Sequence, residues 1–108
     1  MKPLRLRPAA EEDLVEATRY YSAEAGRFVA ERFFNDALAA LDTLKQRPRI
    51  GSLRLGALCD MPGLRSWRLK DFPMQWFYFD TPRHLDVVRL LGDRQDILAI
   101  LESDRQDR

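Results

Sequence analysis

A chain of 108 residues has the length of one domain, which predicts a single unit over residues 1–108. Its 18 Lys and Arg residues nearly balance its 17 Asp and Glu residues, and a net charge of +1 argues against nucleic-acid binding driven by bulk charge, although it leaves room for a local basic patch. One cysteine, Cys59, and one histidine, His84, exclude an internal disulfide and a metal site built from several Cys or His ligands. The sequence has neither an apolar run of membrane-spanning length nor an apolar signal-peptide core. We therefore expect a cytoplasmic domain that needs no cofactor or metal and does not contact a membrane.

The first half of the chain predicts a short strand followed by two helices. Alternating leucines predict a strand over Lys2–Arg7, and Pro8 ends it. Acidic residues follow in the expected first helical turn, and apolar residues at helical spacing predict a helix over Ala9–Ala25. After Gly26 a broader apolar stripe predicts a second helix over Arg27–Arg47. Because no long linker separates the two helices, we expect an antiparallel hairpin.

The second half of the chain changes to strands. Gly and Pro residues punctuate a connection over residues 49–64, in which Leu53 and Leu55 indicate a short extended piece. Three strands are then predicted, over Leu64–Phe72, Met74–Asp80 and Leu85–Leu91. The second of these is apolar and aromatic on both faces, which is typical of a central strand.

A short final helix is predicted beyond the last strand. Asp93 is a suitable N-cap for it, and the charged residues 103–108 are expected to form a frayed tail. The predicted order is strand, helix, helix, three strands and a short helix. Two segregated helices and an antiparallel meander indicate an α+β fold, with the helices packed on one face of the sheet.

Short local patterns punctuate the chain from its first helix to its end. They are the acidic helix start at residues 10–14, Tyr20-Tyr21, Pro48-Arg49-Ile50-Gly51, Pro62-Gly63-Leu64-Arg65, Phe72-Pro73, Tyr78-Phe79, residues 87–91, and Arg94-Gln95-Asp96. In this order and spacing they resemble the RelE/ParE superfamily of bacterial toxins from type II toxin–antitoxin systems, and most of all its ParE-type members. The resemblance covers nearly the whole chain, and it implies an N-terminal strand, a helical hairpin, a three-stranded antiparallel meander and a short C-terminal helix.

The resemblance also implies a function. ParE-type toxins inhibit DNA gyrase by binding and arrest growth, whereas RelE-like toxins cleave mRNA on the ribosome. A ParD-like antitoxin would neutralise a ParE-type toxin, and operator DNA would be contacted only through their complex. RelE-like enzymes often carry a His where Gly92 stands, or a Tyr near the C-terminus, and no tyrosine follows Tyr78 here. This departure and the near-neutral charge favour a gyrase inhibitor without catalytic residues.

Two other functional hypotheses remain open. In a RelE-like ribonuclease, Arg65 and Arg68 would clamp the scissile phosphate, and Lys70 or Arg89 would stabilise charge. A non-toxic scaffold with the same fold would cause no growth arrest. His84, the only imidazole, lies at the start of a predicted strand and is expected to be an exposed edge residue rather than a catalytic one.

Basic residues on the predicted strands are the candidates for target binding. They are Arg65, Arg68, Arg89 and Arg94. Together they could form a patch that contacts gyrase, RNA or antitoxin carboxylates, and the alternative is a solvated sheet face with scattered ion pairs. Strand alternation places Arg89 on the same face as Leu85, Val87 and Leu91.

Aromatic residues are the candidates for antitoxin binding. They are Tyr20 and Phe28 on the hairpin, and Trp76 and Tyr78 on the predicted central strand. The hairpin carries more apolar surface than one sheet face can cover, which indicates a groove for an amphipathic antitoxin helix. The alternative is that these rings fill the core, since aromatic side chains bury large areas.

Overall fold

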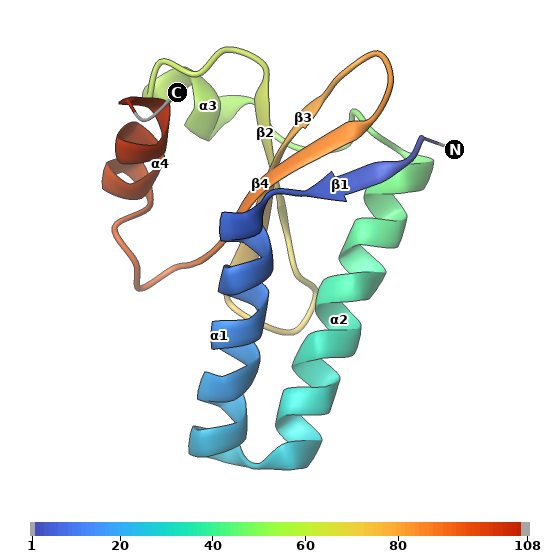
Figure 1. The fold of residues 1–108 in the computed structure, drawn as a ribbon, viewed down its shortest axis with the longest axis vertical. Coiled ribbons are helices and arrows are strands. Elements are labelled where there is room, and N and C mark those ends of the chain that lie inside the picture. Colours follow the sequence, from blue (N-terminus) through green and yellow to red (C-terminus); the bar gives the residue numbers. More distant parts are fainter. Residues whose placement is uncertain (1, 107–108) are drawn as a thin grey trace.

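The computed structural model describes residues 2–106 and confirms the α+β fold class (Figure 1). The elements are β1 (Leu4–Leu6), α1 (Pro8–Ala25), α2 (Arg27–Gln46), α3 (Arg54–Leu58), β2 (Leu64–Arg68), β3 (Met74–Asp80), β4 (Leu85–Gly92) and α4 (Ile97–Gln106). Helix α4 extends well into the segment predicted to be a frayed tail, so that prediction is wrong up to residue 106. Residues 107 and 108 of the predicted tail lie outside the described residues. None of the helices in the described part of the chain has the length and apolar character that a membrane span requires.

Helices α1 and α2 form the expected antiparallel hairpin (Figure 1). Pro8 starts α1 at a position where its missing N–H costs no hydrogen bond. Gly26 joins the helices with a φ of 90°, a conformation that favours glycine, and its N–H donates to the carbonyl of Ser22. One residue is therefore enough to reverse the chain.

The four strands form one sheet in the order β1-β4-β3-β2. β1 pairs with β4 in parallel, and β2, β3 and β4 form the predicted antiparallel meander. β3 lies between two neighbours, as its apolar character on both faces predicts. Trp76 and Tyr78 pack beneath the hairpin with Phe33, and the Trp76 indole donates to the Ala37 carbonyl at 3.0 Å.

Helices cover both faces of the sheet, so the prediction that they pack on one face is wrong. The hairpin covers one face, whereas α3 and α4 lie together beyond the opposite side (Figure 1). There Leu101 of α4 packs with Phe77 and Leu91, and all three side chains are fully buried. The physical reason is that a strand with apolar side chains on both faces loses contact with water only when both faces are covered.

A β-bulge in β4 changes which face its later residues occupy. Val87 pairs with Tyr78 and Arg89 pairs with Phe77, so one residue of β4 between these pairs has no partner. Because side chains alternate along a strand, the extra residue moves Leu91 to the α4 side while Val87 stays under the hairpin. The prediction that these residues and Arg89 share a face is therefore wrong.

Two local predictions about the connecting segments are also wrong. Leu53 and Leu55 are not extended, because the chain forms α3 there and Gly56 packs so closely on β2 that an added Cβ would lie 2.5 Å from the Leu64 carbonyl oxygen. The predicted N-cap of the final helix, Asp93, lies before the helix. The residue that caps α4 is Asp96, whose Oδ1 accepts the N–H of Ala99.

Candidate functional site

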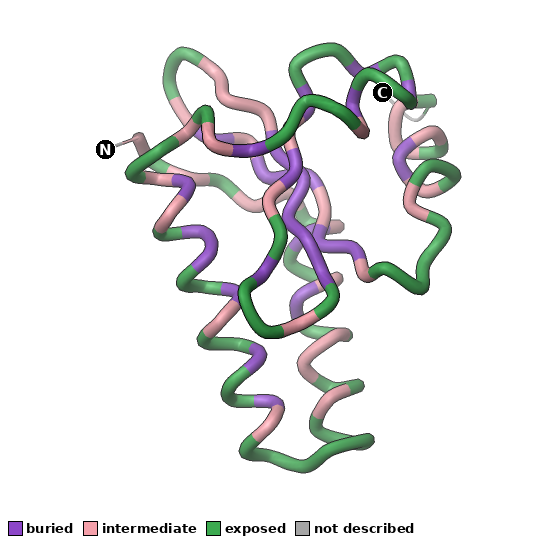
Figure 2. The backbone as a smooth tube through the Cα atoms, turned by 180° about the vertical axis from the view of Figure 1, so that it is seen from behind, coloured by how far each residue is buried: buried purple, intermediate pink, exposed green. Residues whose placement is uncertain are grey.

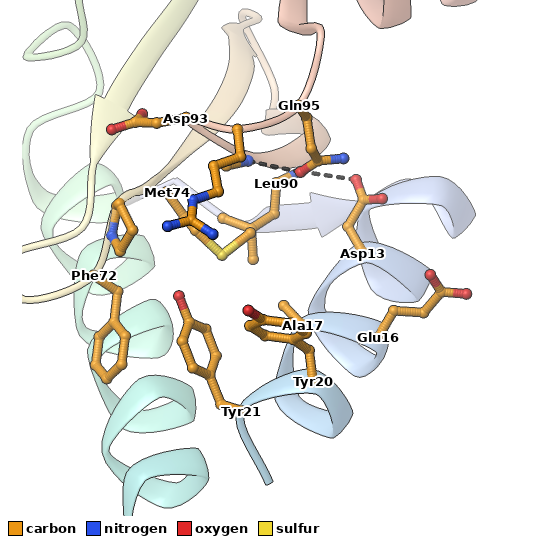
Figure 3. Close-up of a pocket in the computed structure, with 13 residues that line it drawn as sticks. Asp13, Glu16, Ala17, Tyr20, Tyr21, Phe72, Met74, Leu90, Asp93 and Gln95 are labelled. Atoms are coloured by element: carbon orange, nitrogen blue, oxygen red, sulfur yellow. Dashed lines mark hydrogen bonds between the residues drawn. The ribbon is translucent and has the colours of Figure 1, made fainter. Parts of the chain in front are cut away.

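A groove of about 730 Å³ opens beside α1, between that helix, the turn that joins β2 to β3, and the segment that follows β4 (Figure 3). We call it the α1 groove. Its lining comprises Asp13, Glu16, Ala17, Tyr20 and Tyr21 of α1, Phe72, Pro73 and Met74 of the turn and β3, and Leu90, Gly92, Asp93, Arg94 and Gln95 from β4 onward. The α1 residues converge because positions three or four apart share one face of a helix.

Two adjacent tyrosines give the α1 groove its aromatic side. Tyr20 is 55% exposed, and its ring meets that of Tyr21 edge to face, with centroids 5.4 Å apart. Tyr21 packs in turn against Phe33 and Phe72, at 4.8 and 5.0 Å. Burial raises the pKa of the Tyr21 hydroxyl, and the nearby Arg94 charge opposes this only in part. The hydroxyl is therefore neutral near pH 7 and serves as a hydrogen-bond donor or acceptor.

Arg94 is the available cation of the α1 groove. It lies in the exposed segment after β4, and across residues 2–106 its side chain forms no ion pair or hydrogen bond. Its positive charge acts on the pKa of Tyr21, which places the two groups in the same electrostatic environment. An arginine with no carboxylate partner is free to bind an incoming anionic group.

Arg89 has a different position from the one predicted, because it is held inside the protein. Its guanidinium makes two hydrogen bonds to Asp13, at 2.7 and 2.8 Å, and an ion pair of 3.2 Å with Asp104. Asp13 also accepts the backbone N–H of Leu90 at 3.0 Å. Hydrogen bonding to Asp13 raises the pKa of Arg89 above its ordinary value. Since these contacts join β4 to α1 and α4, Arg89 supports one wall of the α1 groove.

Arg65 lies at the sheet edge and holds the connection between α2 and α3. Its Nη1 donates to the carbonyls of Arg49 and Gly51, at 3.0 and 2.9 Å. Tyr78 fixes the same segment, because its hydroxyl donates to Pro48 and accepts the N–H of Gly51. The hydrogen bonds of Arg65 therefore go to uncharged carbonyl oxygens and not to a carboxylate.

Arg68 forms a two-point contact with Asp93 at the rim of the α1 groove. The nitrogen–oxygen distances are 3.0 and 2.8 Å, and both side chains are exposed. Hydrogen bonding to Arg68 lowers the pKa of the Asp93 carboxyl. The structure therefore separates the four predicted arginines into Arg94 in the α1 groove, Arg89 behind its wall, and Arg65 and Arg68 along β2.

The predicted antitoxin contacts also separate. Phe28 is 76% exposed at the start of α2, away from the α1 groove, with the Arg27 guanidinium 5.9 Å from its ring centre. Trp76 and Tyr78 are fully buried beneath the hairpin and offer no surface to a partner in this conformation. Tyr20 is the predicted aromatic contact that lines the groove.

Comparisons with known proteins agree with this fold and show the family of the chain. A family model described as the ParE toxin of the type II toxin–antitoxin system parDE matches residues 4–105. This chain belongs to the ParE toxin family. A solved chain titled as the chromosomal ParDE toxin–antitoxin system from P. aeruginosa has the same fold, with a TM-score of 0.72 and 21% sequence identity over 85% of this chain and 96% of that chain. Curated protein sequences give no significant match.

Membership of the ParE family confirms the resemblance that the local patterns indicated. Sequence reasoning missed the groove residues Phe72 and Gln95, although it quoted the short patterns that contain them. The spacing of Asp13, Glu16 and Tyr20 is the sequence feature that could have indicated this groove, since it places the three residues on one face of α1.

His84 is half-buried in the β3–β4 turn, where its Nδ1 lies 3.2 Å from the Thr81 hydroxyl. Within residues 2–106, no three Cys, His, Asp or Glu side chains gather as a metal site would require.

Proposed function

We propose that this ParE-family toxin inhibits DNA gyrase by binding to it, and that a ParD-like antitoxin neutralises it by covering the α1 groove. The family match over residues 4–105 carries the proposal.

The lining of the α1 groove indicates the chemistry of the antitoxin segment. Ala17 and Phe72 are half-buried and offer apolar surface, the nearly buried Met74 and Leu90 lie at the floor of the groove, and Tyr20 adds an exposed ring. Arg94 offers a positive charge without an internal partner. An amphipathic segment with apolar side chains toward the floor and an acidic side chain toward Arg94 fits these features.

The groove also supplies a physical means of neutralisation. Arg94 is one of the arginines proposed to contact the target, and Tyr20 is one of the aromatics proposed to contact the antitoxin. Both line the same groove, so a segment seated on Tyr20 covers Arg94 as well. We therefore propose that antitoxin and target compete for this surface, with Arg65 and Arg68 extending the target contact along β2 and Arg89 supporting the wall.

The test is a supercoiling assay with purified toxin, gyrase and relaxed plasmid, in which trapped cleaved DNA is also measured. The wild-type chain should inhibit supercoiling, and the antitoxin should relieve the inhibition. Arg94→Ala should weaken inhibition by about 10–100-fold, the loss expected for one charged hydrogen bond of about 1.5–3 kcal/mol. Arg27→Ala removes another exposed arginine, one outside the groove, and should leave inhibition unchanged. Folded toxin in excess that leaves gyrase unaffected but causes cleavage of ribosome-bound mRNA would replace this proposal with the ribonuclease alternative.

A further inference from the structure

The small net charge of the chain conceals a strongly basic segment. Residues 43–70 contain seven Lys or Arg and one acidic residue, a net charge of +6, whereas the rest of the chain carries −5. The basic residues are Lys45, Arg47, Arg49, Arg54, Arg65, Arg68 and Lys70. The single acid, Asp60, acts electrostatically on Arg105 of α4. Two of these cations are ion-paired with acids outside the segment, Lys45 with Asp42 and Arg68 with Asp93, which leaves a net charge of +4. A local field of this size acts on partners independently of the net charge of the chain.

The fold gathers this segment at one edge of the sheet. β2 is an outer strand, and the connection that precedes α3 pairs with it through two hydrogen bonds of 2.9 Å between Ser52 and Ser66. The contact of Arg65 with the carbonyl of Arg49 brings the connection and β2 together at a second point. Seen from behind, the connection crosses in front of the sheet, and most of it is exposed (Figure 2). We call this surface, from Arg47 to Lys70, the basic edge.

Most cations of the basic edge have no carboxylate partner. Among the described residues, the exposed side chains of Arg47, Arg49, Arg54 and Lys70 form no ion pair, and Arg65 bonds only to carbonyl oxygens. The basic edge therefore carries at least four accessible positive charges that no internal group neutralises.

We propose that the basic edge binds the phosphate backbone of double-stranded DNA without reading its sequence. Guanidinium groups match phosphate geometry, and a duplex presents phosphates in a regular row. Arg68 is not counted among these contacts, because strand alternation places it on the opposite face of β2 from Arg65 and it is paired with Asp93. Helix α3 has five residues, too short to fill the major groove, so the contacts position the backbone rather than specify bases. This departs from the expectation that the toxin meets DNA only through its antitoxin complex.

The test is the fluorescence anisotropy of a labelled 20-base-pair duplex of mixed sequence, titrated with the full chain between 50 and 200 mM KCl. Neutralising about four phosphates gives a slope of log K against log salt of about −3.6, a loss of more than about a hundredfold over this range. Arg49→Glu/Arg54→Glu should weaken binding at 50 mM at least about tenfold and make the salt dependence less steep, with a slope less negative by about 1.8. The matched control is Arg19→Glu/Arg32→Glu, which changes the net charge equally at two exposed arginines of the hairpin and should bind like the wild type.

Three outcomes would overturn the inference. Equal losses in both double variants would show that only net charge matters. Tighter binding of single-stranded RNA of the same length would assign the basic edge to RNA, and displacement of the duplex by an equal charge concentration of polyglutamate would assign it to an acidic protein. Circular-dichroism melting of each variant shows whether it is folded. Because the assay contains no gyrase, its result is separate from the proposed function.

Discussion

Removing the Arg89 side chain should destabilise the protein more than removing any surface arginine. Its side chain is 17% exposed and that of Asp13 is 13% exposed, so the pair lies largely out of water. In Arg89→Ala the Asp13 carboxylate keeps the backbone N–H of Leu90 but loses both hydrogen bonds from the guanidinium. The variant therefore leaves a mostly buried negative charge without its counter-ion.

The expected cost is about 3–5 kcal/mol, the range for breaking a buried pair from one side. A domain of this length unfolds with about 0.23 kcal/mol/K of entropy, so the melting temperature should fall by about 13–22 °C. The raised pKa of Arg89 gives stability that is fully present below the unfolded pKa of arginine and is lost only as the pH rises through the higher folded value. The loss should thus be the same from pH 6 to pH 9.

Urea unfolding and thermal melting measure this loss, with Arg27→Ala as the matched control. Arg27 pairs with Glu31 at 3.6 Å on the exposed hairpin, and its removal should cost less than about 0.5 kcal/mol. The double variant Arg89→Ala/Asp13→Ala should lose less than the sum of the two single variants, because it leaves no unpaired Asp13 carboxylate, and Asp104, which also loses Arg89, is more exposed. A cost below about 1 kcal/mol for Arg89→Ala would refute the reasoning, since the pair would then behave as a solvated surface contact.

Two further predictions concern the sheet edge and the groove rim. Gly51→Ala should lower the free energy of unfolding in urea by about 1–3 kcal/mol, because its Cβ would lie 2.6 Å from the buried Tyr78 hydroxyl. In the control Gly92→Ala the added Cβ meets neighbours no closer than 3.5 Å, so the free energy of unfolding should fall by less than about 0.5 kcal/mol. Equal costs for both would contradict the close approach. Arg68→Ala should raise the pKa of Asp93 toward its ordinary 3.8 in an NMR titration. Because the folded pKa is the lowered one, the stability that this pair contributes is present above pH 4 and is lost as the pH falls through the folded pKa. An unchanged Asp93 pKa in the variant would show that the contact is not populated in solution.

Much of the fold was predictable because its signals are local. The apolar stripes that predicted the helical hairpin and the alternation that predicted the meander depend on neighbours within one or two turns or strand steps. Local signals failed where a distant contact decided the outcome. The alternation of Leu53 and Leu55 predicted an extended piece, yet the chain turns there into α3, with Gly56 tight against β2.

The candidate site shows the same division at the level of single residues. The pattern of Tyr20 beside Tyr21 and the arginine after the last strand were visible in the sequence, and the structure places Tyr20 and Arg94 in one groove. The burial of Trp76 was one of two alternatives that the sequence left open, and the structure confirms it. The capture of Arg89 by Asp13 was not visible, because the partners of Arg89 are set by the packing of elements far apart in the chain.

The sequence by itself determined the helical hairpin, the meander, the central position of β3 and, through the order of its short patterns, the ParE family, but not α3 or the full length of α4. Only the tertiary structure decided which charges are available. Arg89 and Arg94 are five residues apart, yet one is enclosed by carboxylates from α1 and α4 and the other lies open in the α1 groove. A residue type fixes the charge it can carry, but burial and partners fix whether that charge can meet another molecule.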